Sequence, residues 1–488
     1  MKSVIVIGAG LGGLSAAISL AAKGYGVTVL EQQAEAGGKL QRIEMNGYRF
    51  DRGPSTITMP HIFRRLFSSV GRQLEDYVQM EQLEPGTRNL FTDGHAVDFT
   101  SDLTAMEKQI ARFSPKDAAM YRSFMKESKR LYDTSESLFL NRLLHHWRAK
   151  ADIRLLAGLI SVRPATGYHS LLRRYFSHPN TLAMLGRYAT YVGSSPYLAP
   201  AIFAMLPHLE QQLGVYGVRD GTYKLVAAFR KLAEELGVVF RFGCKVTAIN
   251  SSKRRVTGVS SDCGDFSAEL VIANGDVLST AAELLTEQQR PSLSDRRIDR
   301  LEPSLSGYAV LAGVRRVYDR LLHHTVFFPE RYGSEFEDIF RRKRLPAAPA
   351  IYVCYSGYSQ PGMAPEGCSN LFLLANAPYM TGENRHMLSG EGYGDRLLRQ
   401  LERAGLQDLT ASLACKQSYT PVRLQDDTSA YRGGIYGISS NSARQTFFRP
   451  SNRGDLNGLW FVGGTTHPGG GTPLVTLSGM LVAEAIDS

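Results

Sequence analysis

The sequence predicts an α/β protein, and the same arrangement at its two ends is the main reason. Within the first forty residues, a short apolar run meets a glycine-rich turn and then an Ala/Leu/Val-rich helix pattern. Residues 459–486 repeat this order of apolar run, glycine turn and helix. Such turns place bare backbone N–H groups beside a helix N-terminus, where they attract a phosphate or a polar ring edge. We therefore expect both ends of the chain to fold around one cofactor.

Length and composition limit the possible classes of protein. The 488 residues suffice for two or three domains, and the net charge is +10. We expect no nucleic-acid partner, because the chain has no zinc spacing, ribonucleoprotein motif or basic region with heptads. The five cysteines are scattered and never form a C-x-x-C pair, which predicts free thiols in a reducing cytosol. We find no signal-peptide pattern and no apolar run long enough to span a bilayer.

The N-terminal segment predicts a βαβ unit. Ser3–Ile7 is a continuous apolar run, as expected for a strand buried on both faces of a parallel sheet. A helix is predicted from Leu14 to Lys23, closed by a glycine, and a second strand over Val27–Leu30. This unit is the first half of a Rossmann-like, dinucleotide-binding domain.

The turn inside this unit fits the pattern G-x-G-x-x-G. Gly8 makes the tight turn, Gly10 lets the backbone approach a pyrophosphate, and Gly13 allows close packing of helix on sheet. Glu31 follows the second strand and is placed to accept a hydrogen bond from a ribose hydroxyl. The residues expected to bind the dinucleotide here are Gly8, Ala9, Gly10, Gly12, Gly13, Leu14 and Glu31.

A second glycine pair follows soon after the acidic residue. Ala36-Gly-Gly-Lys-Leu40 lets the chain pass close to the pyrophosphate, and Lys39 can supply a cation. With these residues the chain resembles the flavin amine-oxidase and carotenoid-desaturase superfamily, whose members carry a GG-[RK] element and bind FAD. The resemblance implies FAD as the cofactor, with further contacts from Gly38, Lys39, Gly53, Pro54, Ser55, Val246, Gly464 and Pro473.

Longer stretches narrow the resemblance to carotenoid enzymes. Phe50–Ile57 and Thr466–Pro473 are similar to phytoene-desaturase-type proteins, and matching stretches such as Gly217–Leu225 extend over essentially the whole chain. Gly463-Gly464 before the final turn, and Thr472–Gly479 after it, are most similar to the diaponeurosporene oxygenase subfamily. These enzymes oxidise a terminal methyl of an acyclic carotenoid to the aldehyde.

The resemblance thus implies FAD-dependent oxidation of the terminal methyl of an acyclic (diapo)carotenoid to the aldehyde. The alternative is desaturation of an acyclic carotenoid or a squalene-like precursor by the same flavin. An alternative of another class is a non-catalytic prenyl-binding carrier of the GDP-dissociation-inhibitor kind. Two positions depart from the family pattern, Lys39 where many members have Arg and Asp220-Gly221 where the family often has Gly-Gly.

The domain organisation is expected to be discontinuous. Segments 1–101, 216–300 and 440–488 are assigned to the FAD-binding domain. Apolar runs within 301–439 predict a mixed-sheet substrate domain, and residues 102–215 show helical periodicity with many aromatic and basic residues. The expected type is therefore that of amine oxidases and carotenoid desaturases, with a helical, membrane-associating insert.

The stretch from Asn141 to Phe176 is a candidate membrane surface. This stretch contains seven basic residues and a single acidic one, Asp152, and apolar residues including Trp147 are interleaved with them along the sequence. An interfacial helix on anionic lipid has this composition, and an ordinary amphipathic helix with a solvated basic face is the alternative. Because a polyene dissolves in lipid, we expect a cytoplasmic protein peripherally bound to the inner face of the cell membrane. The oligomeric state is left open.

Histidines give one candidate catalytic residue. His467 lies inside the C-terminal glycine turn, where it can either donate a hydrogen bond near the flavin or fix the geometry of the turn. The adjacent pairs His145-His146 and His323-His324 are expected to point apart, so no metal site is predicted. No acid or base is assigned, because the flavin carries the chemistry and a polyene delocalises the charge that develops on it.

Overall fold

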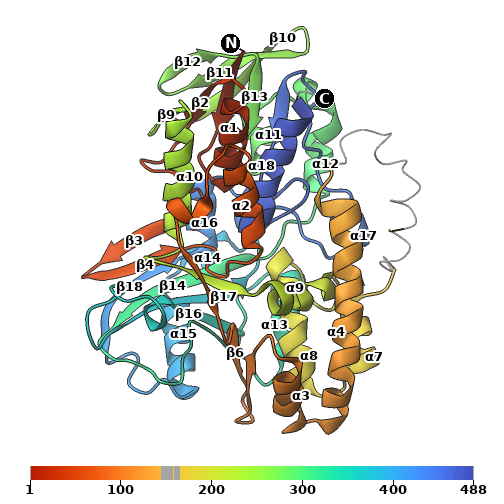
Figure 1. Ribbon diagram of the computed structural model, residues 1–488, viewed down its shortest axis with the longest axis vertical. Helices are drawn as coiled ribbons and strands as arrows, with labels where there is room; N and C mark the ends of the chain where they lie inside the picture. Colours follow the sequence, from red (N-terminus) through yellow and green to blue (C-terminus); the bar gives the residue numbers. More distant parts are fainter. Residues whose placement is uncertain (1, 144–157, 159–164, 487–488) are drawn as a thin grey trace.

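The computed structural model describes residues 2–143, 158 and 165–486 of the chain (Figure 1). Near both termini, at one end of the long axis, five parallel strands form a sheet in the order β19-β13-β1-β2-β9. Their bounds are β1 Ser3–Ile7, β2 Gly26–Leu30, β9 Val239–Arg241, β13 Leu270–Ala273 and β19 Leu459–Phe461. Strands from three distant segments thus share one sheet, which confirms that the two chain ends fold together.

Helices α1 (Leu11–Ala21), α10 (Tyr223–Glu235) and α18 (Thr472–Ile486) pack together beside this sheet. The first and last helices touch closely, since a Cβ on Gly479 would lie 2.5 Å from the carbonyl oxygen of Gly12. The Ser15 hydroxyl donates to the Thr476 carbonyl over 2.7 Å across the same contact. The other helices of this part are α2 (Pro60–Ser68), α11 (Val277–Leu284) and α12 (Asp295–Asp299).

Smaller antiparallel elements lie around the parallel sheet. One is a three-stranded sheet of β10 (Val246–Ser252), β11 (Arg255–Ser261) and β12 (Gly264–Ser267). The others are the hairpin of β3 (Gln41–Met45) with β4 (Tyr48–Arg52), and the pair of β5 (Met80–Leu83) with β8 (Val215–Val218).

The second large sheet of the protein is mixed and has seven strands, in the order β18-β14-β17-β16-β15-β6-β7. Its strands are β6 Thr87–Leu90, β7 Ala96–Phe99, β14 Ser306–Val314, β15 His324–Phe327, β16 Ile351–Tyr355, β17 Ser369–Ala377 and β18 Leu413–Tyr419. Associated helices are α13 Tyr332–Phe336, α14 Arg385–Ser389, α15 Gly392–Arg403 and α16 Pro421–Thr428, whereas Phe447 of α17 (Ala443–Phe447) packs against Phe139. Because β6 and β7 join this sheet through β15, the predicted segment 1–101 is shared between the two sheets.

A helical block lies beside the seven-stranded sheet (Figure 1). Its α-helices are α3 Leu103–Ala111, α4 Pro115–Ser135, α7 Tyr168–Tyr175, α8 Pro179–Gly186 and α9 Leu206–Leu213. Shorter helical turns are η2 Glu136–Leu140, η3 Arg187–Val192 and η4 Ala201–Met205. Helices are the main elements of the described part of 102–215, up to β8, which begins at Val215.

Most of the candidate membrane surface lies outside the described residues, and so does the pair His145-His146. Its described end is α7, which buries Leu171 and Leu172 and exposes Arg173 and Arg174. Among the described residues, no helix has both the length and the apolar character needed to cross a bilayer.

Candidate functional site

A cavity of about 820 Å³ runs between the parallel sheet, the seven-stranded sheet and the helical block. The residues predicted to contact the cofactor that line it are Gly8, Gly10, Gly12, Glu31, Gly38, Lys39, Gly53, Pro54, Ser55, Val246, Gly464 and Pro473. His467 lines it as well. Residues far apart in sequence thus meet at the carboxyl ends of the parallel strands, where open α/β sheets bind their ligands. That they bind FAD stays a prediction.

Three of the predicted residues lie behind the cavity wall. The Ala9 N–H donates to Glu31, and Leu14 is fully buried in the core beneath the sheet. A Cβ on Gly13 would lie 2.2 Å from the carbonyl oxygen of Gly8, so only glycine permits this contact of helix and turn. Their role is to shape the loop from behind.

The glycine loop presents bare backbone at the start of α1. Gly10 is the N-cap of this eleven-residue helix and has no side chain to cap it. A Cβ on Gly10 would lie 2.8 Å from Nδ2 of Asn274 and 4.0 Å from Cα of Gly38. The first and second glycine elements therefore face each other across a narrow gap, with the open N–H groups of the helix available to an anion.

Glu31 is fixed at the end of β2 by two backbone donors. Its Oε2 accepts from the Ala9 N–H at 2.7 Å and its Oε1 from the Gln33 N–H at 2.9 Å. Burial raises the pKa of Glu31, and these backbone N–H groups partly offset the rise. Each carboxylate oxygen retains capacity for a further hydrogen bond, as a ribose hydroxyl would require.

Two polar residues directly after β13 were not predicted. Asn274 donates from Nδ2 to the Gly8 carbonyl at 3.3 Å, and Asp276 caps the N-terminus of α11. The Oδ2 of Asp276 has no hydrogen-bond partner within the described part of the chain. Burial raises the pKa of Asp276, which the neighbouring Lys39 partly counteracts. The position of these residues at the end of an apolar run was a usable sequence signal.

Two cations stand near the glycine turns. The Lys39 ammonium donates to the carbonyl of Ile435 at 2.5 Å, and burial lowers its pKa. Arg449, which was also not predicted, donates to the carbonyls of Tyr436 and Gly464 at 3.1 and 3.0 Å. Burial lowers the pKa of Arg449 to about 10, so the side chain stays charged at neutral pH. Both cations favour an anionic ligand.

Ser55 connects the cavity wall to the seven-stranded sheet. Its hydroxyl lies 2.7 Å from the Tyr352 hydroxyl, which in turn lies 2.7 Å from Nδ1 of His324.

The expectation that His323 and His324 point apart is wrong, because their ring centroids are 4.5 Å apart. His323 lies one residue before β15, so the rule that successive side chains of a strand point to opposite faces does not apply to it. Their ligand atoms and that of Cys354 lie within 4.8 Å of one another.

His467 is held by the helical block. Its Nε2 lies 2.7 Å from the carbonyl oxygen of Phe139, so this nitrogen carries the proton and donates. Burial lowers the pKa of His467 to about 4, although the bond to Phe139 opposes the shift. The side chain is therefore neutral at physiological pH, and its Nε2 has a positioning role. A catalytic role for His467 stays a prediction.

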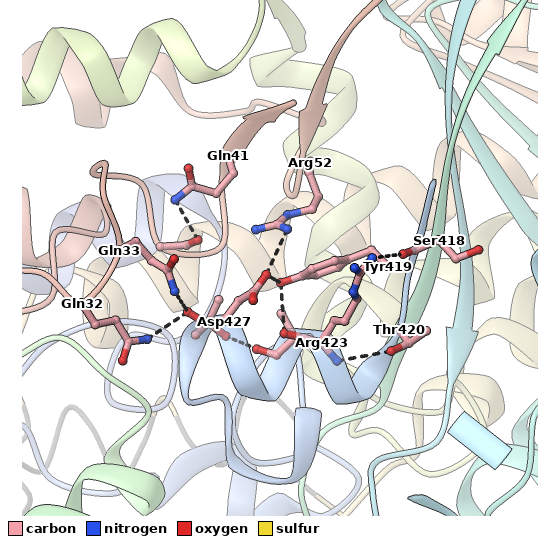
Figure 2. Close-up of polar contacts among 12 residues, drawn as sticks. Gln32, Gln33, Gln41, Arg52, Ser418, Tyr419, Thr420, Arg423 and Asp427 are labelled. Carbon is pink, nitrogen blue, oxygen red and sulfur yellow. Dashed lines mark hydrogen bonds and ion pairs between the residues drawn. The ribbon is translucent and has the colours of Figure 1, made fainter. Parts of the chain in front are cut away.

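Asp427 of helix α16 lines the cavity, as Glu31 does, and Figure 2 shows the polar contacts around Asp427. The Asp427 carboxylate accepts from Arg52 Nη1 at 3.1 Å and from the Tyr419 hydroxyl at 2.9 Å. The backbone carbonyl of Asp427 accepts from the side chains of Gln32 and Gln33 at 2.9 and 3.0 Å. We call this set of five residues the Asp427 clamp. It ties the second sheet to the loop after β2.

The cavity wall on the side of the helical block is mainly apolar. Residues of η4 and α9 meet residues of the seven-stranded sheet there, namely Ile202, Phe203, Met205, Leu206, Leu209, Val326 and Phe372. A long hydrocarbon can therefore bind in this half of the cavity, and its binding is favoured because apolar surface is removed from water.

The polar half fits FAD. The open N-terminus of α1 and the cations Lys39 and Arg449 suit its diphosphate, Glu31 suits a ribose hydroxyl, and the glycine turns let flat rings approach the backbone. When bound, FAD supplies a two-electron acceptor beside the apolar half. The protein itself orients the ligands and keeps water away.

Comparisons with known proteins agree with this geometry. The family model described as flavin containing amine oxidoreductase matches residues 11–487. A 4,4′-diapolycopene oxygenase from Methylomonas sp is 36% identical over 491 residues, which cover 99% of this chain and 98% of that protein. A 4,4′-diaponeurosporene oxygenase from Staphylococcus aureus (strain Mu50 / ATCC 700699) is 35% identical and covers 100% and 98%.

Solved structures show the same fold. An oxidoreductase from Methanosarcina mazei superposes with a TM-score of 0.68 at 17% identity, covering 99% of this chain and 100% of that one. Putrescine oxidase superposes with a TM-score of 0.66 at 13% identity, covering 100% and 99%. The chain therefore belongs to the flavin-containing amine oxidoreductase family and is an FAD-dependent oxidoreductase.

Proposed function

We propose that this enzyme oxidises the terminal methyl group of an acyclic C30 carotenoid to an aldehyde. The full-length similarity to the two oxygenases carries the proposal. The apolar half of the cavity supports it, because a polyene has no polar atoms and needs a dry, apolar channel. The cavity joins this channel to the glycine turns, so a polyene end can reach the flavin.

The reaction asks little acid–base chemistry of the protein. Conversion of a methyl to an aldehyde, with one water admitted to supply the oxygen, releases four electrons and four protons, and bound FAD would supply a two-electron acceptor for each half of this oxidation. The developing charge is delocalised over the polyene itself. The tasks left to the side chains are to bind the flavin and the polyene and to hold the reacting methyl group beside the flavin.

Incubation of the FAD-loaded protein with 4,4′-diaponeurosporene, followed by mass spectrometry of the pigment, tests this proposal. The expected product has gained one oxygen and lost two hydrogens. A product that has only lost hydrogen would refute the oxidation and support desaturation instead. Controls with boiled protein and with flavin removed should leave the pigment unchanged.

We also propose that the enzyme works in the cytoplasm at the inner face of the cell membrane, where its substrate dissolves. Three large apolar side chains support surface contact, since Phe448, Leu198 and Tyr197 are 64%, 52% and 43% exposed. Sedimentation with vesicles tests the idea. Anionic vesicles should bind the protein in a salt-sensitive manner, and a protein left in the supernatant with both anionic and neutral vesicles would refute it.

A further inference from the structure

The helical block contributes a buried ion pair to the cavity. Arg187 begins η3 and Glu210 lies on α9, and both line the cavity together with Tyr191. The guanidinium and carboxylate are 3.7 Å apart, and the two side chains are only 6% and 2% exposed. Burying two charges in this way is unfavourable unless hydrogen bonds replace the lost water.

These hydrogen bonds are incomplete. Arg187 donates from Nη1 to the Tyr191 hydroxyl at 2.6 Å, and the Tyr188 hydroxyl donates to Oε2 of Glu210 at 2.5 Å. The guanidinium also lies 4.8 Å from the centroid of the Tyr188 ring. Nε and Nη2 of Arg187 and Oε1 of Glu210 find no hydrogen-bond partner among the residues that the structure describes. The pair therefore has spare donors and a spare acceptor.

A pure hydrocarbon does not account for this pair. The neighbouring wall consists of apolar side chains such as Ile202, Phe203 and Leu209, which already suit a hydrocarbon. A polyene without oxygen leaves the ion pair desolvated and unsatisfied. A carbonyl oxygen can accept from the guanidinium, and a hydroxyl can also donate to the carboxylate.

We propose that Arg187, held in place by Glu210, binds the oxygenated end group of a polyene, an aldehyde or a primary alcohol. The site then distinguishes partly oxidised polyenes from the parent hydrocarbon. This inference rests on the proposed function, because it assigns a subsite to the same polyene channel. Arg187 and Glu210 also join η3 to α9, and a purely structural tie is the competing explanation.

Binding without turnover tests the subsite. The protein, loaded with FAD and reduced with dithionite so that the flavin cannot accept electrons, is titrated without oxygen, in detergent micelles, with 4,4′-diaponeurosporene and with its terminal aldehyde. Quenching of protein fluorescence gives the two dissociation constants. A charged hydrogen bond in a dry site should make the aldehyde bind about 10- to 100-fold more tightly than the hydrocarbon. Its absorption band should shift to the red, because a cation near the carbonyl oxygen stabilises the excited state.

The informative variant is the double substitution Arg187→Met with Glu210→Gln. Removing both charges leaves no unpaired ion, and glutamine still offers an acceptor to the Tyr188 hydroxyl. The variant should lose the preference for the aldehyde and the red shift, while its affinity for the hydrocarbon stays within about twofold. Arg316→Met, at an exposed arginine that pairs with Asp408, is the control and should change neither affinity.

Each outcome decides the question. Equal binding of the two pigments by the parent protein, without a red shift, overturns the subsite but leaves the proposed substrate class intact. An equal loss of affinity for both pigments in the double variant indicates a structural tie only. Binding of neither pigment by the parent protein refutes the substrate class, and the subsite with it. If the double variant does not fold, the spectrum and the two affinities of the parent protein remain the test.

Discussion

Replacing Asp427 with alanine removes the side-chain half of the Asp427 clamp and leaves its backbone half in place. The carboxylate contacts with Arg52 and Tyr419 are lost, whereas Gln32 and Gln33 bind the backbone carbonyl and keep their acceptor. Because α16 lines the cavity beside the Glu31 region, we expect the substitution to loosen the rim that covers the bound cofactor.

The structure gives the size of the effect. A hydrogen bond to a charged group contributes about 1.5–3 kcal/mol when buried. The Arg52 side chain is 13% exposed but that of Asp427 is 39% exposed, so water screens the pair and the contribution falls to about 1–2 kcal/mol. If the clamp opens before FAD leaves, Asp427→Ala accelerates FAD release by roughly 5- to 30-fold.

Dilution of the holoenzyme, with recovery of free-flavin fluorescence as the readout, measures this rate. Asp408→Ala removes a surface ion pair with Arg316 whose side chains are 41% and 69% exposed, and it should leave the rate unchanged. A lower melting temperature of Asp427→Ala with an unchanged release rate would show that the clamp stabilises the fold without gating the cofactor.

Three further predictions concern the glycine turns and their neighbours. Glu31→Ala should yield protein that loses FAD on gel filtration, whereas Glu35→Ala, at an exposed neighbour, should retain it. Gly13→Ala should fail to give soluble holoenzyme because its Cβ meets backbone at 2.2 Å, and Gly382→Ala, with open space around it, should fold normally. Burial lowers the pKa of His467 from 6.5 to about 4, so between these values the unfolded chain binds a proton that the folded protein does not. The neutral side chain therefore contributes fully to the free energy of unfolding above pH 6.5, and this contribution is lost as the pH falls toward 4. As the pH falls from 6.5 to 4, the unfolding free energy of His467→Gln should drop by about 3 kcal/mol less than that of the parent protein, measured by denaturant unfolding at each pH. An equal drop in both proteins would contradict this assignment.

Local patterns made the cofactor half of the molecule predictable. A continuous apolar run, glycines at fixed spacing and an acidic residue after the next strand specify β1, α1 and β2 with few long-range choices. The hairpin of β3 and β4 was missed although its signal was present. Asn46 and Gly47 lie between the strands, both with positive φ, as a two-residue hairpin turn requires.

Partner choice between distant segments was not predictable in the same way. Nothing local tells β6 and β7 to join β15 rather than the sheet of β1, because strand pairing depends on which edge is free in the folded protein. The Asp427 clamp and the pair of Arg187 with Glu210 are single residues brought together by tertiary packing, and they carry no spacing pattern. The polar residues after β13 could have been found from their place at a strand end.

The contact between the first and last helices has a consequence for biosynthesis. The ribosome releases β1 and α1 before the rest of this fold, but β19 and α18, which complete the sheet and cover α1, are translated after all its other elements. Throughout elongation the N-terminal unit therefore lacks its packing surface, and its apolar strands are open to chaperones or to aggregation. Cofactor loading accordingly belongs to the finished chain, and production of holoenzyme in a cell depends on how long that exposed intermediate survives.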